Sequence, residues 1–207
     1  MGDGPRDGAG YDSVPDEELM LRSGRGDTDA FEALVARHER GLVGYFHRLH
    51  WDRHRAEDQA QEVFIRLFTH ARDYAPTARF TTYMYRIAHN YWVDDIRRAK
   101  KERGQVSLDA HDEEGTSLRE LVVSGADDPR DRARKEEVLD AVIGAVDTLP
   151  DEQKAVFVLA EVREMRYADI AEVLGIPEGT VKSRMHGAVR RLRTRLADIA
   201  PRGTRES

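Results

Sequence analysis

The sequence predicts an all-α protein made of two small helical domains joined by a flexible acidic linker. Apolar residues recur at the three- and four-residue spacing of helices, and no long segment alternates with the period of two that marks a strand. The composition is 40% hydrophobic but only 7% aromatic, which suits compact helical units better than a large β-core. Residues 102–128 hold eight acids and two arginines, a net charge of −6 that equals the formal charge of the whole chain.

The first domain is expected over residues 16–101, after a disordered tail over residues 1–15 that is rich in Gly, Pro and Asp. Asp27 and Asp29 are both placed to cap the second helix of this domain. A polar loop containing Pro76 separates the last two helices. The predicted elements are a helical region from Asp16, a helix from Ala30 to about Leu49, a helix over about 56–71, a loop over 72–79 and a helix over about 80–101.

The second domain is expected over residues 134–198, between the acidic linker (102–133) and a short tail (199–207). In the turn Leu149-Pro150-Asp151, the aspartate is placed to cap the following helix. Gly175 suits the position just after a helix, where a left-handed backbone is common. The predicted helices cover about 133–148, 152–162, 167–174 and 178–199.

The composition excludes several classes of protein. The chain has no cysteine, so disulfides and thiolate metal sites are excluded. No apolar run approaches the roughly 18 residues of a membrane span, and the first residues, MGDGPRDGAGYDSVP, lack the apolar core of a signal peptide. We therefore expect a soluble cytoplasmic protein.

Three histidines close together raise the possibility of a zinc site. His50 and His54 are four residues apart, with His47 nearby, and zinc could use that spacing. The sequence contains no HExxH motif, and a structural metal would need further ligands. Surface histidines at a helix end are the favoured interpretation, so no metal and no cofactor are expected.

The sequence also gives little support for an enzyme. Asp94 and Asp95 are adjacent and therefore point to different sides of a helix, which makes them poor candidates for paired acid–base catalysis. Asp94 is expected to pair with Arg97 or Arg98 instead. We find no phosphate-binding loop and no arrangement of a nucleophile with a base.

The segment YADIAEVLGIPEGTVKSRMHGAVRRL (167–192) has the helix, glycine-containing turn and helix of a helix-turn-helix motif. The inner face of its second helix is apolar. The outer face carries small polar side chains near the N-terminus of the helix and strongly cationic ones further along. That division suits contacts to base edges and to phosphates. The inner residues are Val181, Met185, Ala188, Leu192 and Leu196; the outer ones are Ser183, His186, Gly187, Arg190 and Thr194, flanked by Lys182 and Arg184.

A second notable segment is AEDQAQEVFIRLF (56–68). One face of this predicted helix is apolar and suits a core. The opposite face combines acids with an isoleucine, which a core-packing helix does not require and which could suit a partner of complementary charge. The apolar face holds Ala56, Ala60, Val63, Phe64 and Leu67; the opposite face holds Asp58, Gln61, Glu62 and Ile65.

Two parts of the chain resemble a known family. AEDQAQEVF followed by FTTYMYRIAHNYWVDDIRR resembles region two of a bacterial extracytoplasmic-function sigma factor. LPDEQKAVFVLAEVREMRYADIAEVLGIPEGTVKSR resembles region four of the same family. The resemblance covers about residues 16–101 and 134–197, in the expected order, with a linker between them. It implies a protein without catalytic activity that binds core RNA polymerase, directs it to promoters and helps to open the DNA.

The resemblance also implies roles for particular residues. The polymerase-binding residues would be Asp58, Gln61, Glu62 and Ile65. Residues contacting the minus-ten element would be Tyr74, Thr77 and Arg79 in the loop, with Asn90 and Arg97 on the polar side of the fourth helix. Residues reading the minus-thirty-five element would be Lys182, Ser183, Arg184, His186 and Arg190. An anti-sigma factor is a further implied partner.

Two positions depart from the family pattern. Tyr83 replaces a common tryptophan and keeps an aromatic ring, whereas Gly187 replaces a residue that is commonly basic. Promoter sequence therefore cannot be carried over from the family. Two other hypotheses remain: an autonomous helix-turn-helix regulator that binds operators as a dimer, and an interaction module for another cytoplasmic protein. The first leaves the acidic face of 56–68 unexplained, and the second leaves the basic C-terminal face unexplained.

Overall fold

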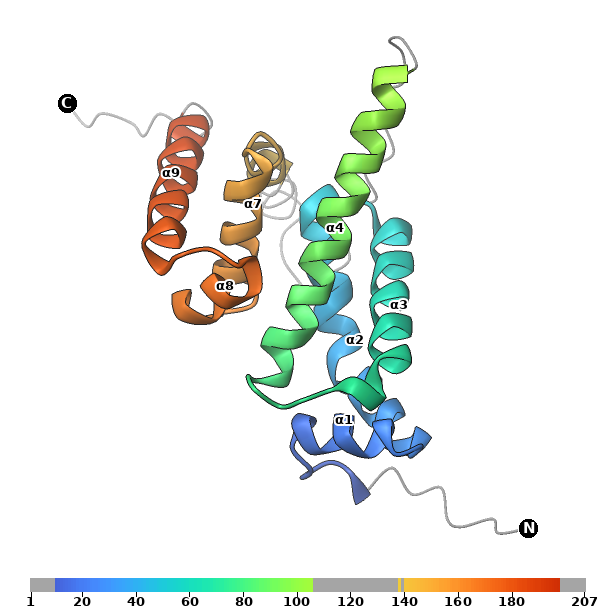
Figure 1. Ribbon diagram of the computed structural model, residues 1–207. Helices are drawn as coiled ribbons and strands as arrows, with labels where there is room; N and C mark the ends of the chain where they lie inside the picture. Colours follow the sequence, from blue (N-terminus) through green and yellow to red (C-terminus); the bar gives the residue numbers. More distant parts are fainter. Residues whose placement is uncertain (1–9, 106–137, 139, 198–207) are drawn as a thin grey trace, which may run out of the picture.

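The computed structural model describes residues 10–105, 138 and 140–197, and all regular structure in these ranges is helical (Figure 1). This confirms the predicted all-α fold with two helical halves. The greater part of the expected acidic linker lies outside the described residues. The N-terminal half comprises α1 (Asp16–Gly24), α2 (Thr28–His50), α3 (Arg53–Thr69), the 3-10 turn η2 (Ala71–Asp73) and α4 (Phe80–Gln105). The C-terminal half comprises a helix over 140–147, α7 (Asp151–Phe157), the π-helical turn η3 (Val158–Val162), α8 (Tyr167–Leu174) and α9 (Glu178–Ala197).

Aspartate caps determine where α2 and α3 begin. The Asp27 side chain accepts a hydrogen bond from the Ala30 backbone N–H at 3.0 Å, as predicted, and Asp29 lies inside the helix. The Asp52 side chain accepts one from the Arg55 N–H at 3.0 Å, so α3 begins at Arg53, three residues earlier than expected. Each carboxylate satisfies an N–H group that the first helical turn leaves free.

The start of α4 is fixed by a residue from a distant part of the chain. The Glu17 carboxylate in α1 accepts a hydrogen bond from the Phe80 backbone N–H at 2.7 Å. The helix then continues to Gln105, four residues beyond the expected end.

Residues 10–15, which were expected to belong to the disordered tail, are held against α2. The Tyr11 hydroxyl lies 3.0 Å from Asp27 Oδ2, and the Arg37 guanidinium donates to the Val14 carbonyl oxygen at 2.7 Å. The ordered chain therefore begins before Asp16. The tail prediction overlooked these contacts because a Gly- and Asp-rich composition does not show what a longer-range arginine will bind.

The C-terminal half follows the prediction with two corrections. Residues 152–162 do not form one α-helix, because α7 ends at Phe157 and continues as the wider π-turn η3. Asp151 lies in the first turn of α7 and makes no side-chain cap; Pro150 occupies the cap position. Gly175 ends α8 in the predicted left-handed conformation, with φ 64°. The expected last turn of α9, to Ile199, lies beyond the described residues.

The two halves pack against each other rather than standing apart. α8 lies against α4, as Figure 1 shows, and one buried apolar cluster contains residues of both halves, such as Tyr85 and Trp92 from α4 with Ile170 and Val173 from α8. The buried Lys154 ammonium in α7 donates to Asp147 at 2.8 Å and to the Leu49 carbonyl oxygen of α2 at 3.4 Å. We call this contact region the seam.

Candidate protein and nucleic-acid interfaces

The outer face of α3 is partly apolar and acidic, as the sequence predicted. Ile65 is 52% exposed, and Asp58 and Gln61 are also exposed. Glu62 is half-buried and accepts a hydrogen bond from Arg66 at 2.9 Å. Asp58 forms no ion pair within the described part of the chain.

Phe68 belongs to this face but was missed from the sequence. Its side chain is 50% exposed and stacks edge-on against Phe31, with 5.0 Å between ring centroids. The sequence could have indicated this, because Phe68 follows Ile65 by three residues and the two side chains therefore lie on one side of the helix. An isolated exposed apolar side chain is ordinary, but two large ones side by side among acids form an interface candidate.

The loop before α4 exposes only some of its predicted residues. Thr77 and Arg79 are exposed, whereas Tyr74 is buried beneath the loop, with its ring 5.1 Å from that of Tyr83. Burial raises the pKa of Tyr74 to about 12, so its hydroxyl stays protonated at neutral pH. Tyr74 therefore supports the loop from below, and Thr77 and Arg79 are the groups that solvent can reach.

The polar side of α4 is divided between solvent and the seam. Asn90 and Arg97 are exposed, and Arg97 lies 3.6 Å from Asp94, the pairing expected from the sequence. His89 and Arg97 both line a groove of about 290 Å³ at the seam, together with Trp92, Arg184 and others. Burial, and secondly the Arg184 charge, lower the pKa of His89 to about 4.

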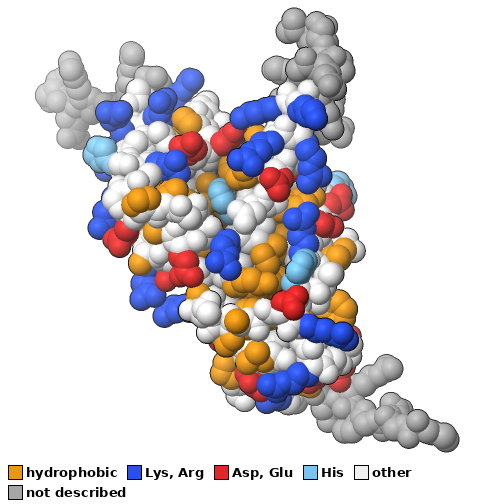
Figure 2. Space-filling model, viewed as in Figure 1, with side chains coloured by type: hydrophobic (Ala, Val, Ile, Leu, Met, Phe, Trp, Pro, Cys, Tyr) orange, Lys and Arg blue, Asp and Glu red, His pale blue; other side chains and the backbone are white. Residues whose placement is uncertain are grey.

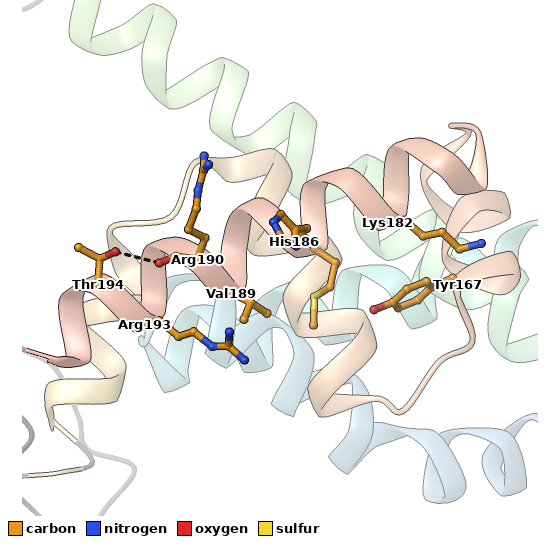
Figure 3. A pocket seen from close by; sticks show the side chains of 8 residues that line it. Tyr167, Lys182, His186, Val189, Arg190, Arg193 and Thr194 are labelled. Atoms are coloured by element: carbon orange, nitrogen blue, oxygen red, sulfur yellow. Dashed lines mark hydrogen bonds between the residues drawn. The ribbon is translucent and has the colours of Figure 1, made fainter.

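The second helix of the helix-turn-helix, α9, has the predicted inner and outer faces. Val181, Met185, Ala188 and Leu192 are buried. A shallow groove of about 620 Å³ runs along the helix, bordered by the start of α8. In Figure 3, Arg190 and Arg193 leave α9 in different directions. The lining residues are Tyr167, Lys182, Met185, His186, Val189, Arg190, Arg193 and Thr194.

The structure places the five predicted minus-thirty-five residues in two groups. Lys182, His186 and Arg190 line the α9 groove, and Ser183 is exposed beside it. Arg184 points elsewhere: its guanidinium lies 2.6 Å from Glu152 of α7, and its side chain is only 25% exposed. Sequence analysis did not predict three further residues that line this groove, because the groove depends on how α8 approaches α9. They are Tyr167, Val189 and Arg193.

Positive charge gathers at two places on the visible face of the molecule. Figure 2 shows Lys and Arg side chains over the upper end of α9 and along the end of α4, with apolar and acidic side chains between them. Lys182 is paired with Glu178 at 2.7 Å, which raises the pKa of Lys182. Basic side chains on two helices provide the electrostatic attraction that phosphate backbones require.

The three histidines considered as metal ligands are not arranged around a common point. His50 Nε2 lies 2.7 Å from Gln59 Oε1, and burial lowers the pKa of His50. His47 stacks against Trp51, and His54 is exposed. The sequence suggested that all three histidines lie on the surface. His50 is instead half-buried. Within residues 10–105, 138 and 140–197, no three candidate metal ligands come together.

No helix in the described ranges is long and apolar enough to cross a membrane.

Comparison with known proteins identifies both halves. The family model for Sigma-70 region 2 matches residues 34–102, and the model for Sigma-70, region 4 matches residues 139–192. The chain is 33% identical over 175 residues to the ECF RNA polymerase sigma factor SigW of Bacillus subtilis (strain 168), covering 84% of this chain and 93% of SigW. It is 31% identical over 197 residues to the ECF RNA polymerase sigma factor SigE of Mycolicibacterium smegmatis, covering 94% of this chain and 69% of SigE.

Two solved structures share the fold. CnrH in complex with the cytosolic domain of CnrY matches with a TM-score of 0.62 and 22% identity, covering 89% of this chain and 98% of that chain. The sigma factor RpoE from Bartonella quintana, in complex with the anti-sigma factor NepR, matches with a TM-score of 0.62 and 19% identity, covering 81% and 96%. Because both sigma-70 regions occur in order and two relatives above 30% identity align over most of their length, the chain belongs to the extracytoplasmic-function (ECF) sigma factors.

Proposed function

We propose that this sigma factor binds core RNA polymerase through the outer face of α3 and directs it to promoters through α4 and α9. One observation carries the proposal. An acidic face with two half-exposed apolar side chains, Ile65 and Phe68, occurs in the same chain as a groove with a cationic border on α9. An autonomous regulator would need only the second of these surfaces. The proposed activity is binding, so we assign no catalytic step to this chain.

The α3 face suits a partner surface that is basic and partly apolar. Ile65 and Phe68 would provide the apolar centre of the contact, surrounded by Asp58, Gln61 and Glu62. Such an arrangement, an apolar core with a charged border, is typical of protein interfaces. Asp58 is the acid most available to a partner, since Glu62 is already bound to Arg66.

We assign the DNA contacts by their accessibility. Thr77, Arg79, Asn90 and Arg97 would contact the minus-ten element, with Tyr74 holding the loop from beneath. Lys182, Ser183, His186 and Arg190 would contact the minus-thirty-five element, and Tyr167 and Arg193 border the same groove. Arg184 would join them only after leaving Glu152.

The separation of the two DNA elements requires the two halves to move apart. The element names imply centres about 25 base pairs apart, which is about 85 Å of duplex at 3.4 Å per base pair. In the described structure α4 and α8 are in direct contact, so the two halves cannot reach both elements at once. Residues 106–137 would span about 110 Å if fully extended, which is enough for the separation. Binding to polymerase would provide the free energy to open the seam.

The remaining assignments follow from family membership. We propose region two over residues 16–101 and region four over residues 134–198, joined by the acidic linker. The protein would act in the cytoplasm, where its polymerase is found. We also propose an anti-sigma factor as a partner; the RpoE structure with this fold is itself a complex with the anti-sigma factor NepR.

The decisive experiment is transcription in vitro with purified protein, core RNA polymerase and genomic DNA fragments, followed by sequencing of the transcript starts. We expect discrete new starts that share two upstream elements. Specific DNA binding by the protein alone, with no binding to core polymerase, would reject the proposal in favour of the autonomous regulator.

A single variant tests the polymerase contact. Asp58→Arg reverses a charge beside the apolar centre of the α3 face, so we expect it to abolish co-purification with core polymerase. Because Asp58 is exposed and unpaired within the described residues, the thermal unfolding curve should not change. Glu172→Arg, the same charge change on the exposed side of α8, is the control. Normal co-purification of the Asp58 variant would remove the assigned role.

A further inference from the structure

Two arginines from different halves of the molecule lie on one face of α2. Arg163, between η3 and α8, places its guanidinium flat against Gly41: its Nη2 atom is 2.7 Å from the position that a Cβ there would take. Arg48 Nη1 is 3.3 Å from the corresponding position at Gly44 and donates to the Gly44 carbonyl oxygen at 3.3 Å. Residues three apart on a helix are neighbours, so these two guanidinium nitrogens lie within about 12 Å of each other.

Neither arginine has a counter-charge within the described ranges of the chain. Arg22, Arg55 and Arg66 each have a carboxylate within 2.9 Å, but Arg48 and Arg163 form no ion pair with any described residue. Burial, and secondly the Arg163 charge, lower the pKa of Arg48. Two like charges held close and partly desolvated are costly unless an anion joins them.

One nitrogen of the pair is also left without a partner. The Nε atom of Arg163 is buried and has no hydrogen-bond partner. The Arg163 guanidinium lies 5.4 Å from the ring centroid of Tyr85, which is 2% exposed, and its positive charge acts to lower the pKa of that tyrosine. Burial outweighs this effect and raises the pKa of Tyr85 to about 12.

We propose that Arg48 and Arg163 form a binding site for a small phosphate-type anion, such as phosphate or the pyrophosphate group of a nucleotide. The planar guanidinium offers paired N–H donors that match phosphate oxygens, and two of them on one helix face suit a group with several oxygens. The chain carries a net charge of −6, so its overall field repels anions and the attraction must come from these local donors.

The position of the site gives the anion a structural consequence. Arg48 belongs to α2 in the N-terminal half, and Arg163 precedes α8 in the C-terminal half. A bound anion therefore links the two halves across the seam and favours the packed arrangement over the separated one. Its removal leaves the two positive charges to repel each other.

Direct titration of the full chain with pyrophosphate tests the site, without magnesium and at an ionic strength held constant with sodium chloride. Isothermal calorimetry should show saturable binding, and pyrophosphate should raise the Tm more than sodium chloride does. Arg48→Gln and Arg163→Gln should each weaken binding at least tenfold. Arg86→Gln is the control, because Arg86 also lies over a tyrosine ring, 5.6 Å from the centroid of Tyr83. This variant should bind pyrophosphate as tightly as the wild type.

Equal binding by wild type and the Arg48→Gln variant would overturn the proposal, as would a response no larger than that to sodium chloride. Arg48→Gln decides the matter even if Arg163→Gln fails to fold, since Arg48 is only half-buried. Displacement of pyrophosphate by a DNA duplex of unrelated sequence, dependent on the same two arginines, would also overturn it and assign the site to nucleic acid. The titration contains no polymerase, so its outcome is independent of the proposed promoter function.

Discussion

His89 should make the stability of the folded protein depend on pH between about 4 and 6.5. Its imidazole is buried at the seam, its Nδ1 atom has no hydrogen-bond partner, and Arg184 lies close to it. These features lower the pKa from 6.5 to about 4 in the folded protein, whereas an unfolded chain restores the ordinary value. The unfolded state therefore binds more protons in this range, and stability falls as the pH falls.

The size of the effect follows from the two pKa values. Well above pH 6.5 the histidine is neutral in both states and contributes nothing to the pH dependence. At pH 5 the linkage gives a loss of about 2 kcal/mol, which approaches about 3 kcal/mol below pH 4. Other charged groups line the same groove, namely Arg97 and Lys100 from α4, Asp151 and Glu152 from α7, and Arg184 from α9. The comparison must therefore isolate His89 from them.

Urea unfolding at pH 7.5, 6 and 5 of the wild type and of His89→Leu provides that comparison. The variant cannot be protonated at this position, so we expect its stability relative to the wild type to rise by about 2 kcal/mol between pH 7.5 and pH 5. His50 and the carboxylates contribute equally to both proteins and cancel. His186→Gln, at an exposed histidine of α9, should show no such rise. A constant difference between wild type and His89→Leu at all three pH values would refute the reasoning.

Two further predictions concern helix ends and helix packing. Glu17→Gln weakens the acceptor for the Phe80 N–H and should cost about 1 kcal/mol in urea unfolding, whereas Glu18→Gln, which loses only an exposed pair with Arg22, should cost less. Gly187→Ala would gain about 1 kcal/mol of helix propensity, but the new Cβ would lie 3.0 Å from Gln153 Nε2, so we expect no gain in Tm unless Gln153→Ala is combined with it. A full gain in the single Gly187→Ala variant would show that Gln153 moves away freely.

Local signals were enough to predict much of the fold and the two outer surfaces. The bounds of α8 and the left-handed Gly175 follow from the apolar spacing and from the conformational freedom of glycine. The inner face of α9 and the exposed Ile65 on α3 follow from helical periodicity alone. Each of these features depends on residues within one or two turns, which is the range over which such patterns are informative.

Features that the apolar pattern does not mark, or that depend on distant residues, were missed. The early start of α3 depends on Asp52, whose carboxylate competes well as a cap but whose position in HWDRHR looked like a simple break. The π-turn η3 has no composition that distinguishes it from an α-helix. The seam could not be predicted because its contacts join residues far apart in the sequence, such as Lys154 and Leu49, which are 105 positions apart. Periodicity shows that a face is apolar, but not what covers it.

Arg184 shows how the seam alters the interpretation of a motif. Its position on α9 placed it beside the residues proposed to read DNA, yet the structure pairs it with Glu152, whose side chain is 70% exposed. An ion pair with one partner so exposed stabilises by less than about 1 kcal/mol, whereas a good arginine contact to a base contributes about 1–3 kcal/mol of discrimination. Arg184 would therefore exchange Glu152 for DNA once a duplex lies in the α9 groove. That exchange would also withdraw a positive charge from His89 and raise its pKa, so DNA binding and the protonation of the seam histidine should be coupled.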